Sequence, residues 1–357
     1  MIFVNNTGGS CMNGRIENDM KIFKIIESQL YELPSFISDW YFNLKANKQT
    51  AMTCRDYINK IKLFLSFINP NYSKVKLSDF NELIITKYFI KIQEKEENKN
   101  GNIVVTETSD SYRQAVWSCL NNFFTFLYDR EMIPINYFVK SKIKRPKKKT
   151  NRNIENKKVL LTQDDFNKIL HAIDTGVGSN KAKGYQHRYK NRDKAIMLIF
   201  MTTGMRKTAL TEINVEDIDI DKHKLSVIDK GHIIHEYYLN DVVIDVLKKW
   251  LLDRFFLCGN ESGALFVSKD RTRMTGTSID KLVDKYAKEG LGKHISPHKL
   301  RGGFISILYQ QTGDIEFVRE VVGHSKITTT QNYITTNGKE KEKAAGIMNN
   351  LLNTSQF

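Results

Sequence analysis

Apolar residues recur at intervals of three and four through residues 34–139, which is the period of amphipathic α-helices. One apolar stripe ends at Asn69-Pro70, since proline and the residue before it leave the helical conformation. The stripe consists of Ile58, Ile61, Leu65 and Ile68. The pattern predicts further helices over 21–31, 78–94 and 110–128, with a polar loop over 97–101.

Beyond residue 159 the pattern mixes helical and strand-like periods. Residues 224–228 and 232–239 alternate like strands around Asp229-Lys230-Gly231, which suits a tight hairpin. Residues 264–267 indicate another short strand. Helices are expected over 163–173 and 193–202, and from cap residues Asn240, Ser278, Ser296, Asp314 and Thr329. The pattern therefore predicts a mainly α fold with a small antiparallel β-sheet.

The chain divides into four expected parts. Residues 1–33 form an N-terminal extension, 34–139 a small helical domain, 140–158 a basic linker and 159–357 a mixed domain. The linker begins KSKIKRPKKKT and contains seven cations without an acid: Lys140, Lys142, Lys144, Arg145, Lys147, Lys148 and Lys149. Like charges keep such a run extended and solvated, and a flexible basic tether can follow a phosphate backbone. Nuclear targeting is the competing interpretation of the run.

Composition narrows the class of partner. The formal net charge is +15 and the pI is near 9.4, which favours a polyanion such as DNA. No apolar run approaches the roughly 18 to 20 residues that span a bilayer, and no secretory signal is evident, so a cytoplasmic protein without membrane contact is expected. The cysteines are scattered, which argues against a zinc site and predicts packing roles; they are Cys11, Cys54, Cys119 and Cys258. We expect neither a metal nor a cofactor.

The residues suited to chemistry lie in the second half of the chain. Arginines and histidines can neutralise a pentacoordinate phosphate, a lysine can protonate a departing alkoxide, and a tyrosine hydroxyl can attack phosphorus. The candidates are Arg206, Lys230, His298, Arg301, His324 and Tyr333. His298 and Arg301 follow Ser296-Pro297 at the start of a helix, where free amides attract anions. An ordinary surface helix would account for that pair alone, but not for the whole set.

Four local contexts resemble the tyrosine recombinase family, also called the phage integrase family. Residues 203–206 read T-G-M-R, similar to its T-G-L-R box, and 298–301 read H-K-L-R, similar to its H-x-L-R box. Residues 322–325 read V-G-H-S and are followed at 333 by a tyrosine, similar to its L-G-H-S segment and tyrosine. Lys230 lies where the family carries its lysine, on a β-hairpin.

Two positions depart from the family pattern. An acidic residue usually follows the first arginine by three positions, but Ala209 stands there, so Arg206 must be oriented by another group, with Asp217 and Glu212 as candidates. The second arginine is often followed by a histidine, where this chain has Gly302. Neither position belongs to the six candidate catalytic residues, so we expect these two differences to adjust the activity and not to abolish it.

The resemblance implies a two-domain C-shaped clamp, with a helical core-binding domain and a mixed α/β catalytic domain. It implies that Tyr333 forms a 3′-phosphotyrosyl link with DNA while Lys230 protonates the 5′-hydroxyl that leaves. Arg206 and Arg301 would neutralise the nonbridging oxygens, and His298 and His324 would donate hydrogen bonds or move protons. A 5′-hydroxyl from another strand can then reverse the step.

The implied activity is site-specific recombination that integrates or excises a mobile element. The implied partners are double-stranded DNA, a homotetramer on two DNA sites, and accessory proteins that bend DNA or set direction. The apolar side of the tail over 339–357 would either pack on its own domain or dock on a neighbouring protomer. Alternatives are an Xer-like resolvase, a type IB topoisomerase-like enzyme, and a DNA-binding regulator without catalysis.

Overall fold

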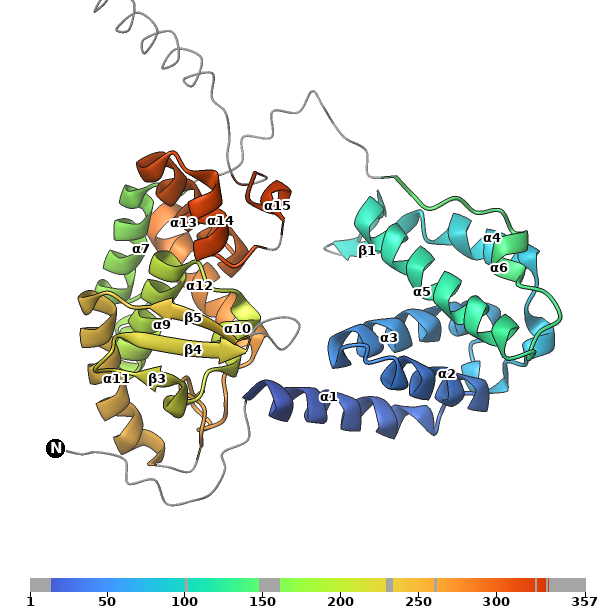
Figure 1. The fold of residues 1–357 in the computed structure, drawn as a ribbon, viewed down its shortest axis with the longest axis horizontal. Helices are drawn as coiled ribbons and strands as arrows, with labels where there is room; N and C mark the ends of the chain where they lie inside the picture. Colours follow the sequence, from blue (N-terminus) through green and yellow to red (C-terminus); the bar gives the residue numbers. More distant parts are fainter. Residues whose placement is uncertain are drawn as a thin grey trace, which may run out of the picture. The chain divides into compact units, whose positions relative to one another are not determined.

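The computed structural model describes residues 14–99, 102–147, 161–228, 234–259, 262–324, 326–331 and 333. The chain forms two compact units, one over Ile16–Ile154 and one over Glu155–Phe357 together with Met1–Arg15 (Figure 1). The expected extension over 1–33 is thus divided, because most of its described part belongs to the first unit. Ile22, Ile26 and Leu30 are buried in the core of that unit.

The first unit is a helical bundle with one β-hairpin. Its elements are α1 (Gly14–Leu30), α2 (Ser35–Ala46), α3 (Ala51–Ile68), η1 (Tyr72–Lys74), η2 (Leu77–Asp79), α4 (Glu82–Lys91), β1 (Glu94–Lys99), β2 (Asn102–Glu107), α5 (Asp110–Asp129) and α6 (Tyr137–Lys140). Side chains cap several helix starts, for example Thr50 for α3 and Ser109 for α5. The predicted apolar side of α5 is confirmed as buried.

Aromatic rings fill much of the core of this unit. Phe64, Phe80, Phe123 and Phe124 are nearly inaccessible and meet largely edge to face, with ring centroids 5.4 to 6.1 Å apart. Trp40 lies 5.1 Å from Phe123. These five aromatic residues are packing groups of the core.

Several boundaries in this unit differ from the predicted ones. The helix expected over 21–31 begins at Gly14. The helix expected over 78–94 begins at Glu82, because the Asn81 side chain accepts the N–H of Ile84 at 2.9 Å and thereby caps α4. The polar loop expected over 97–101 is wrong for residues 97–99, which belong to β1, because β1 and β2 pair antiparallel from Glu94↔Glu107 to Lys99↔Asn102. Residues 100 and 101 lie outside the described residues. The run I-V-V-T and the pair N-G in the sequence are strand and hairpin signals that the loop prediction passed over.

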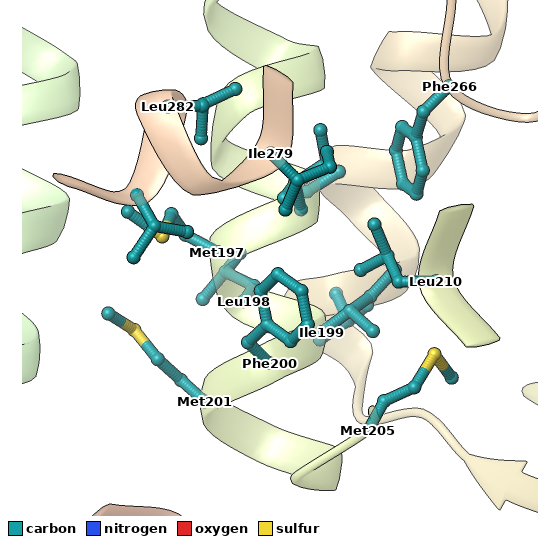
Figure 2. Close-up of a cluster of buried hydrophobic side chains, with 14 of the residues drawn as sticks. Met197, Leu198, Ile199, Phe200, Met201, Met205, Leu210, Phe266, Ile279 and Leu282 are labelled. Carbon is teal, nitrogen blue, oxygen red and sulfur yellow. The ribbon is translucent and has the colours of Figure 1, made fainter. Parts of the chain in front are cut away.

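The second unit surrounds a central apolar helix. Its elements are α7 (Gln163–Thr175), α8 (Asn180–His187), α9 (Lys190–Thr203), α10 (Lys207–Glu212), η3 (Val215–Asp217), β3 (Ile218–Asp219), β4 (Lys224–Ile228), β5 (Ile234–Tyr238), α11 (Asp241–Cys258), α12 (Gly276–Leu291), α13 (Pro297–Thr312), α14 (Ile315–Val321) and α15 (Ile327–Gln331). Helix α9 contacts α7, α11 and α13. Figure 2 shows its side chains among Leu210, Phe266 and Ile279.

A three-stranded antiparallel sheet in the order β3-β4-β5 completes this unit. Leu225 pairs with Tyr237 and Val227 with His235, as expected for a hairpin around residue 230. The strand expected over 264–267 is reduced to isolated bridges at its two ends, Asn214↔Ala264 and Val267↔Arg273. The mainly α fold with a small antiparallel sheet is confirmed.

Several helix starts lie where the capping signals placed them. Thr162, Asn240, Ser296 and Asp314 each accept a backbone N–H from the first turn. The helix expected from Ser278 instead begins at Gly276 with Thr275 as its cap, because the Thr275 hydroxyl accepts the N–H of Ser278. Helix α15 begins two residues before the expected cap Thr329 and ends before Tyr333.

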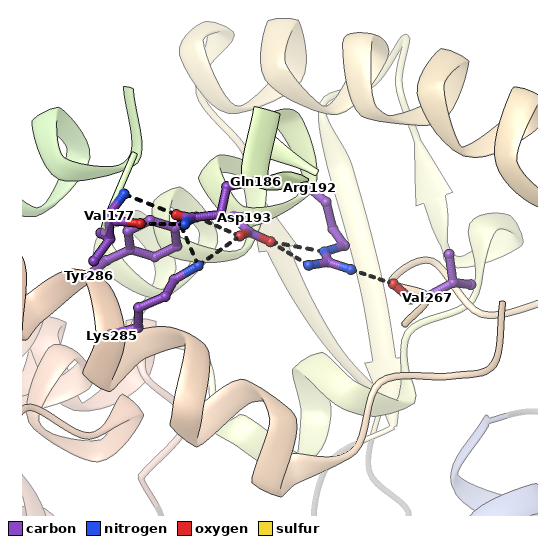
Figure 3. Close-up of polar contacts among 7 residues, drawn as sticks. All are labelled: Val177, Gln186, Arg192, Asp193, Val267, Lys285 and Tyr286. Atoms are coloured by element: carbon purple, nitrogen blue, oxygen red, sulfur yellow. Dashed lines mark hydrogen bonds and ion pairs between the residues drawn. The ribbon is translucent and has the colours of Figure 1, made fainter. Parts of the chain in front are cut away.

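A buried ion cluster ties the start of α9 to its neighbours (Figure 3). The Asp193 carboxylate, 2% exposed, accepts two hydrogen bonds from Arg192 at 2.7 and 2.9 Å and one from the Tyr286 hydroxyl at 2.7 Å. Arg192 also donates to the carbonyl of Val267 at 2.9 Å. Lys285 completes the cluster 3.8 Å from Asp193, and burial lowers its pKa. The cluster joins α9, α12 and the segment between α11 and α12.

The described cysteines Cys54, Cys119 and Cys258 are buried and free, in accord with packing roles, and burial raises the pKa of Cys54 to about 11. In the part of the chain that the structure describes, no helix combines the length and the apolar character needed to cross a bilayer.

Candidate active site

The structure describes five of the six predicted catalytic residues, and all five belong to the second unit. Arg206 follows α9, Arg301 and His298 stand on α13, His324 follows α14, and Tyr333 follows α15. Lys230 lies outside the described residues, between β4 and β5. The flanking strands β4 and β5 are paired and belong to the same unit.

Arg301 is the most buried of these residues, with 3% of its surface exposed. One guanidinium nitrogen donates to the carbonyl of Val322 at 2.7 Å, and another donates to the carbonyl of Gly204. The side chain therefore connects the turn after α9 with the C-terminal end of α14. A buried guanidinium with carbonyl partners is held in one orientation.

Arg206 contacts Gly323, the residue after the one whose carbonyl accepts from Arg301. Gly204 ends α9 with φ +60°, in the left-handed region that glycine tolerates, and a Cβ there would collide with the ring of Phe304. The chain then turns, and the Arg206 guanidinium donates to the carbonyl of Gly323 at 3.3 Å. Both arginines thus contact residues 322–323.

His324 follows these two residues and is nearly buried, with 4% exposed. Its backbone is held by Arg319, whose carbonyl accepts the His324 N–H at 3.0 Å and whose guanidinium donates to the His324 carbonyl at 3.0 Å. Burial, followed by the nearby charges of Arg301 and Arg206, lowers the His324 pKa to about 4. The imidazole is therefore neutral at physiological pH.

Thr330 is a residue of this site that the sequence did not single out. Its hydroxyl is fully buried and lies 2.9 Å from Nδ1 of His324. When this hydroxyl donates to Nδ1, the proton of the neutral imidazole resides on Nε2. In the sequence, Thr330 is one of three consecutive threonines, so only the fold distinguishes it from its neighbours.

Tyr333 is half-buried beside both histidines. Its hydroxyl lies 2.9 Å from Nε2 of His298, and its ring is stacked on that of His324 with centroids 6.1 Å apart. Burial raises the Tyr333 pKa, while the charges of Arg301 and Arg206 act in the opposite direction. Burial and Arg301 lower the pKa of His298, so its neutral ring can accept the phenolic proton.

Gly302, the residue found where the family often has histidine, gives Tyr333 its space. A Cβ at Gly302 would lie 3.0 Å from Cδ1 of Tyr333 and 3.3 Å from Cε1. Both distances are tighter than ordinary van der Waals contact. Glycine instead of histidine at position 302 therefore leaves room for the ring of Tyr333.

His235 on β5 is a second residue that the sequence did not indicate. A Cβ added at Gly323 would lie 2.9 Å from Cε1 of His235, so this strand approaches the loop that carries His324 closely. Gly323 has φ +64°, which also favours glycine. A lone histidine in a strand carries no sequence signal for such a contact.

The substitutes proposed for the missing acid at 209 have other described contacts. The Asp217 carboxylate accepts the N–H of Asn214 at 2.7 Å and so caps the η3 turn. Glu212 forms an ion pair with Arg15 at 4.0 Å. The Gly323 carbonyl is a described partner of Arg206, and Ala209 itself is buried in the core.

The geometry suits a bound phosphodiester. Two guanidinium groups, a neutral histidine and a tyrosine–histidine pair converge within one unit, and such donors stabilise charge that develops on phosphoryl oxygens. Over the described ranges, no group of three or more His, Cys, Asp or Glu side chains is placed to hold a metal ion.

The predicted DNA-binding cations belong to the first unit, the one over Ile16–Ile154. Lys140 ends α6, and Lys142, Lys144, Arg145 and Lys147 follow it with exposed side chains. Lys148 and Lys149 lie outside the described residues. The expectation of a free tether is corrected for residues 141–147, because α5 holds them by hydrogen bonds.

The chain is similar to known proteins over its second half and beyond. Residues 160–340 match the model of the phage integrase family. The chain is 30% identical to tyrosine recombinase XerC of Alcanivorax borkumensis over 171 residues, covering 47% of this chain and 54% of that protein. It thus spans about half the length of that relative. Identity to XerC of Thermodesulfovibrio yellowstonii is 28% over 308 residues, covering 84% of this chain and 90% of that protein.

Two solved structures share the fold. XerH site-specific recombinase bound to palindromic difH substrate, a post-cleavage complex, matches with a TM-score of 0.59 and 18% identity, covering 97% of this chain and 92% of that chain. A lambda integrase tetramer bound to a Holliday junction matches with a TM-score of 0.57 and 16% identity, covering 84% and 76%.

Proposed function

Because the chain belongs to the phage integrase family of tyrosine recombinases, we propose that it is a site-specific DNA recombinase that cuts and rejoins strands through a 3′-phosphotyrosyl intermediate. The observation that carries this proposal is the hydrogen bond between the Tyr333 hydroxyl and His298, 2.9 Å long, in the unit where two arginines contact one loop. A phenol beside a neutral imidazole and two cations is suited to nucleophilic attack on phosphorus.

In the proposed first step, the Tyr333 oxygen forms a bond to phosphorus and its proton passes to Nε2 of His298. Arg206 and Arg301 neutralise the nonbridging oxygens of the pentacoordinate transition state. The bond from phosphorus to the 5′ oxygen breaks, and Lys230 supplies the proton that this oxygen needs. His324 donates from Nε2 to a nonbridging oxygen.

The second step reverses the first with a different strand. A 5′-hydroxyl returns its proton to Lys230 and attacks phosphorus, while the Tyr333 oxygen leaves and recovers a proton from His298. The phosphoester energy is retained in the covalent link, so the exchange needs no nucleotide or metal. We propose that this exchange integrates or excises a mobile element inside the cell.

We further propose that the active assembly is a homotetramer on two duplex sites, helped by accessory proteins that bend DNA or set direction. The similar lambda integrase forms a tetramer bound to a Holliday junction, which supports this assembly. The apolar tail over 339–357 is a proposed contact between protomers, but it lies outside the described residues. Because the chain is similar to proteins named tyrosine recombinase XerC, an Xer-like resolvase is the alternative.

A pool of nicked suicide duplexes of randomised sequence tests the chemistry. The parent should form a covalent adduct that survives denaturant, and sequencing the trapped DNA should reveal the target site. Tyr333→Phe should bind duplex but form no adduct, because it lacks the nucleophile. An adduct with Tyr333→Phe would refute the assignment of the nucleophile.

Two assays with the recovered site distinguish the competing functions. A recombinase exchanges strands between two copies of the site, whereas a topoisomerase-like enzyme relaxes supercoiled plasmid without exchange. A regulator without catalysis would bind the site and give neither product.

A further inference from the structure

The basic segment after α6 is attached to the surface of the helical unit over residues 141–147. The carbonyl of Ile143 accepts a hydrogen bond from the indole N–H of Trp117 at 2.9 Å. The carbonyl of Pro146 accepts one from the side-chain amide of Gln114 at 2.6 Å. Both donors stand on α5, three residues apart, so they face the same side of the helix. Figure 1 draws the segment in green beside α5.

Further contacts strengthen this attachment. The side chain of Ile143 packs against the core of the unit, and the ring of Trp117 meets that of Phe138 edge to face at 5.4 Å. The guanidinium of Arg145 lies over the Trp117 ring, 5.9 Å from its centroid. At the start of the segment, the Ser141 hydroxyl donates to the carbonyl of Phe138 at 2.7 Å.

The attachment sorts the side chains of the segment into two sets. Ile143 and Pro146 are partly buried against the unit, whereas Lys142, Lys144, Arg145 and Lys147 are exposed. Within the described part of the chain, none of these three lysines has an acidic partner. We call Lys142, Lys144 and Lys147 the lysine ridge.

We propose that α5 presents the lysine ridge as a preformed binding surface for the phosphates of duplex DNA, with Trp117 and Gln114 as positioning residues. This inference rests on the proposed DNA-recombining function and deepens it. Lys140 is not counted in the ridge because it pairs with Glu82 at 3.1 Å.

The physical reason is preorganisation. A basic run of this composition is disordered by itself, and a disordered run must lose conformational entropy when it binds. Here the backbone is ordered when the unit folds, because two hydrogen bonds and one apolar side chain hold it. The conformational entropy of the segment is therefore lost on folding and not on binding. For this reason the lysine ridge binds DNA more tightly than a free tether of equal charge would.

The test measures binding of the full chain to a fluorescein-labelled duplex of mixed sequence over a series of salt concentrations. In the detached variant, Trp117→Phe with Gln114→Leu, an aromatic ring is kept at position 117 while both hydrogen-bond donors are lost. In the uncharged variant, Lys142→Gln, Lys144→Gln and Lys147→Gln are combined. A third variant carries both sets of changes, and the parent completes the cycle.

The detached variant should bind about three- to tenfold more weakly than the parent, with an unchanged slope of log affinity against log salt, because the same phosphates are reached. Its amides at 143–147 should exchange hydrogen faster. The slope of the uncharged variant should fall by about 0.9 for each lysine that meets a phosphate. Detachment should weaken binding no further once the lysines are neutral.

Three results would overturn the inference: parental affinity in the detached variant, an equal loss on detachment in both charge backgrounds, or a parental salt slope in the uncharged variant. The uncharged variant alters exposed side chains only, so its slope is a test that does not depend on detachment leaving the unit folded. A parent that does not bind duplex at all would instead refute the proposed function, and the inference with it.

Discussion

Replacing Gly302 with alanine should slow strand cleavage while the protein stays folded and binds DNA. The new Cβ would lie 3.0 Å from Cδ1 of Tyr333, so the ring must move by a few tenths of an ångström. The hydroxyl is more than twice as far from the side-chain pivot as Cδ1, so its displacement approaches ~1 Å. The hydrogen bond to His298, 2.9 Å long, would then lengthen beyond useful range.

The expected loss in cleavage rate is about 10- to 100-fold, since a misplacement of ~1 Å at a reacting atom can cost 10²-fold. Stability should change little or rise, because alanine in a helix interior is favoured over glycine by up to about 1 kcal/mol and offsets the contact. Single-turnover adduct formation on a suicide duplex measures the rate, and thermal unfolding measures the stability.

Gly184→Ala is the matched control. Gly184 also lies within a helix, and nothing stands within 4 Å of a Cβ added there. It should gain the same helical preference without a change in cleavage. Parental cleavage by Gly302→Ala would show that the tyrosine does not depend on this space and would refute the reasoning.

Three further outcomes are expected. Thr330→Val should slow cleavage about tenfold or more, with duplex affinity unchanged, because it removes the hydroxyl that orients His324; Thr330→Ser should restore most of the rate. The His324 pKa is about 4 when folded and 6.5 when unfolded, so the unfolded chain takes up the proton first as pH falls. From neutral pH to about pH 4.5, the parent should therefore lose about 2–3 kcal/mol more stability in denaturant unfolding than His324→Gln, and equal losses would contradict this. Asp193→Ala should lower the free energy of unfolding by about 3–5 kcal/mol, because it leaves the buried guanidinium of Arg192 without its carboxylate partner. Tyr286→Phe should lower it by about 1–3 kcal/mol, because it removes one hydrogen-bond donor to Asp193. Both losses should be seen as faster hydrogen exchange in α9 and α12.

Local signals were sufficient for most elements of this protein. Caps such as Thr162 and Ser296 depend on side chains within three residues, so the sequence alone determines where those helices begin. The pairing of β4 with β5 follows from strand-like patterns on both sides of residue 230. The order and spacing of the six candidate residues likewise indicated the family, because each box is short and continuous.

Local sequence signals did not predict the contacts between segments that are far apart in the chain. Thr330 is one of three adjacent threonines, and only the packing around His324 selects it. Gly302 looked like a loss of a family residue, whereas the structure shows it as room for a ring that lies 31 positions later. The basic segment was expected to be free because its charges repel, but hydrogen bonds from α5 hold its first half.

The sequence thus determined most of the elements, the candidate residues for the chemistry and the excess of positive charge, since each depends on composition or on neighbours along the chain. Tertiary structure decided which carbonyls orient the two arginines, which nitrogen of His324 is available, and which lysines face outward. These properties depend on burial and on partners many residues away, which no local pattern encodes.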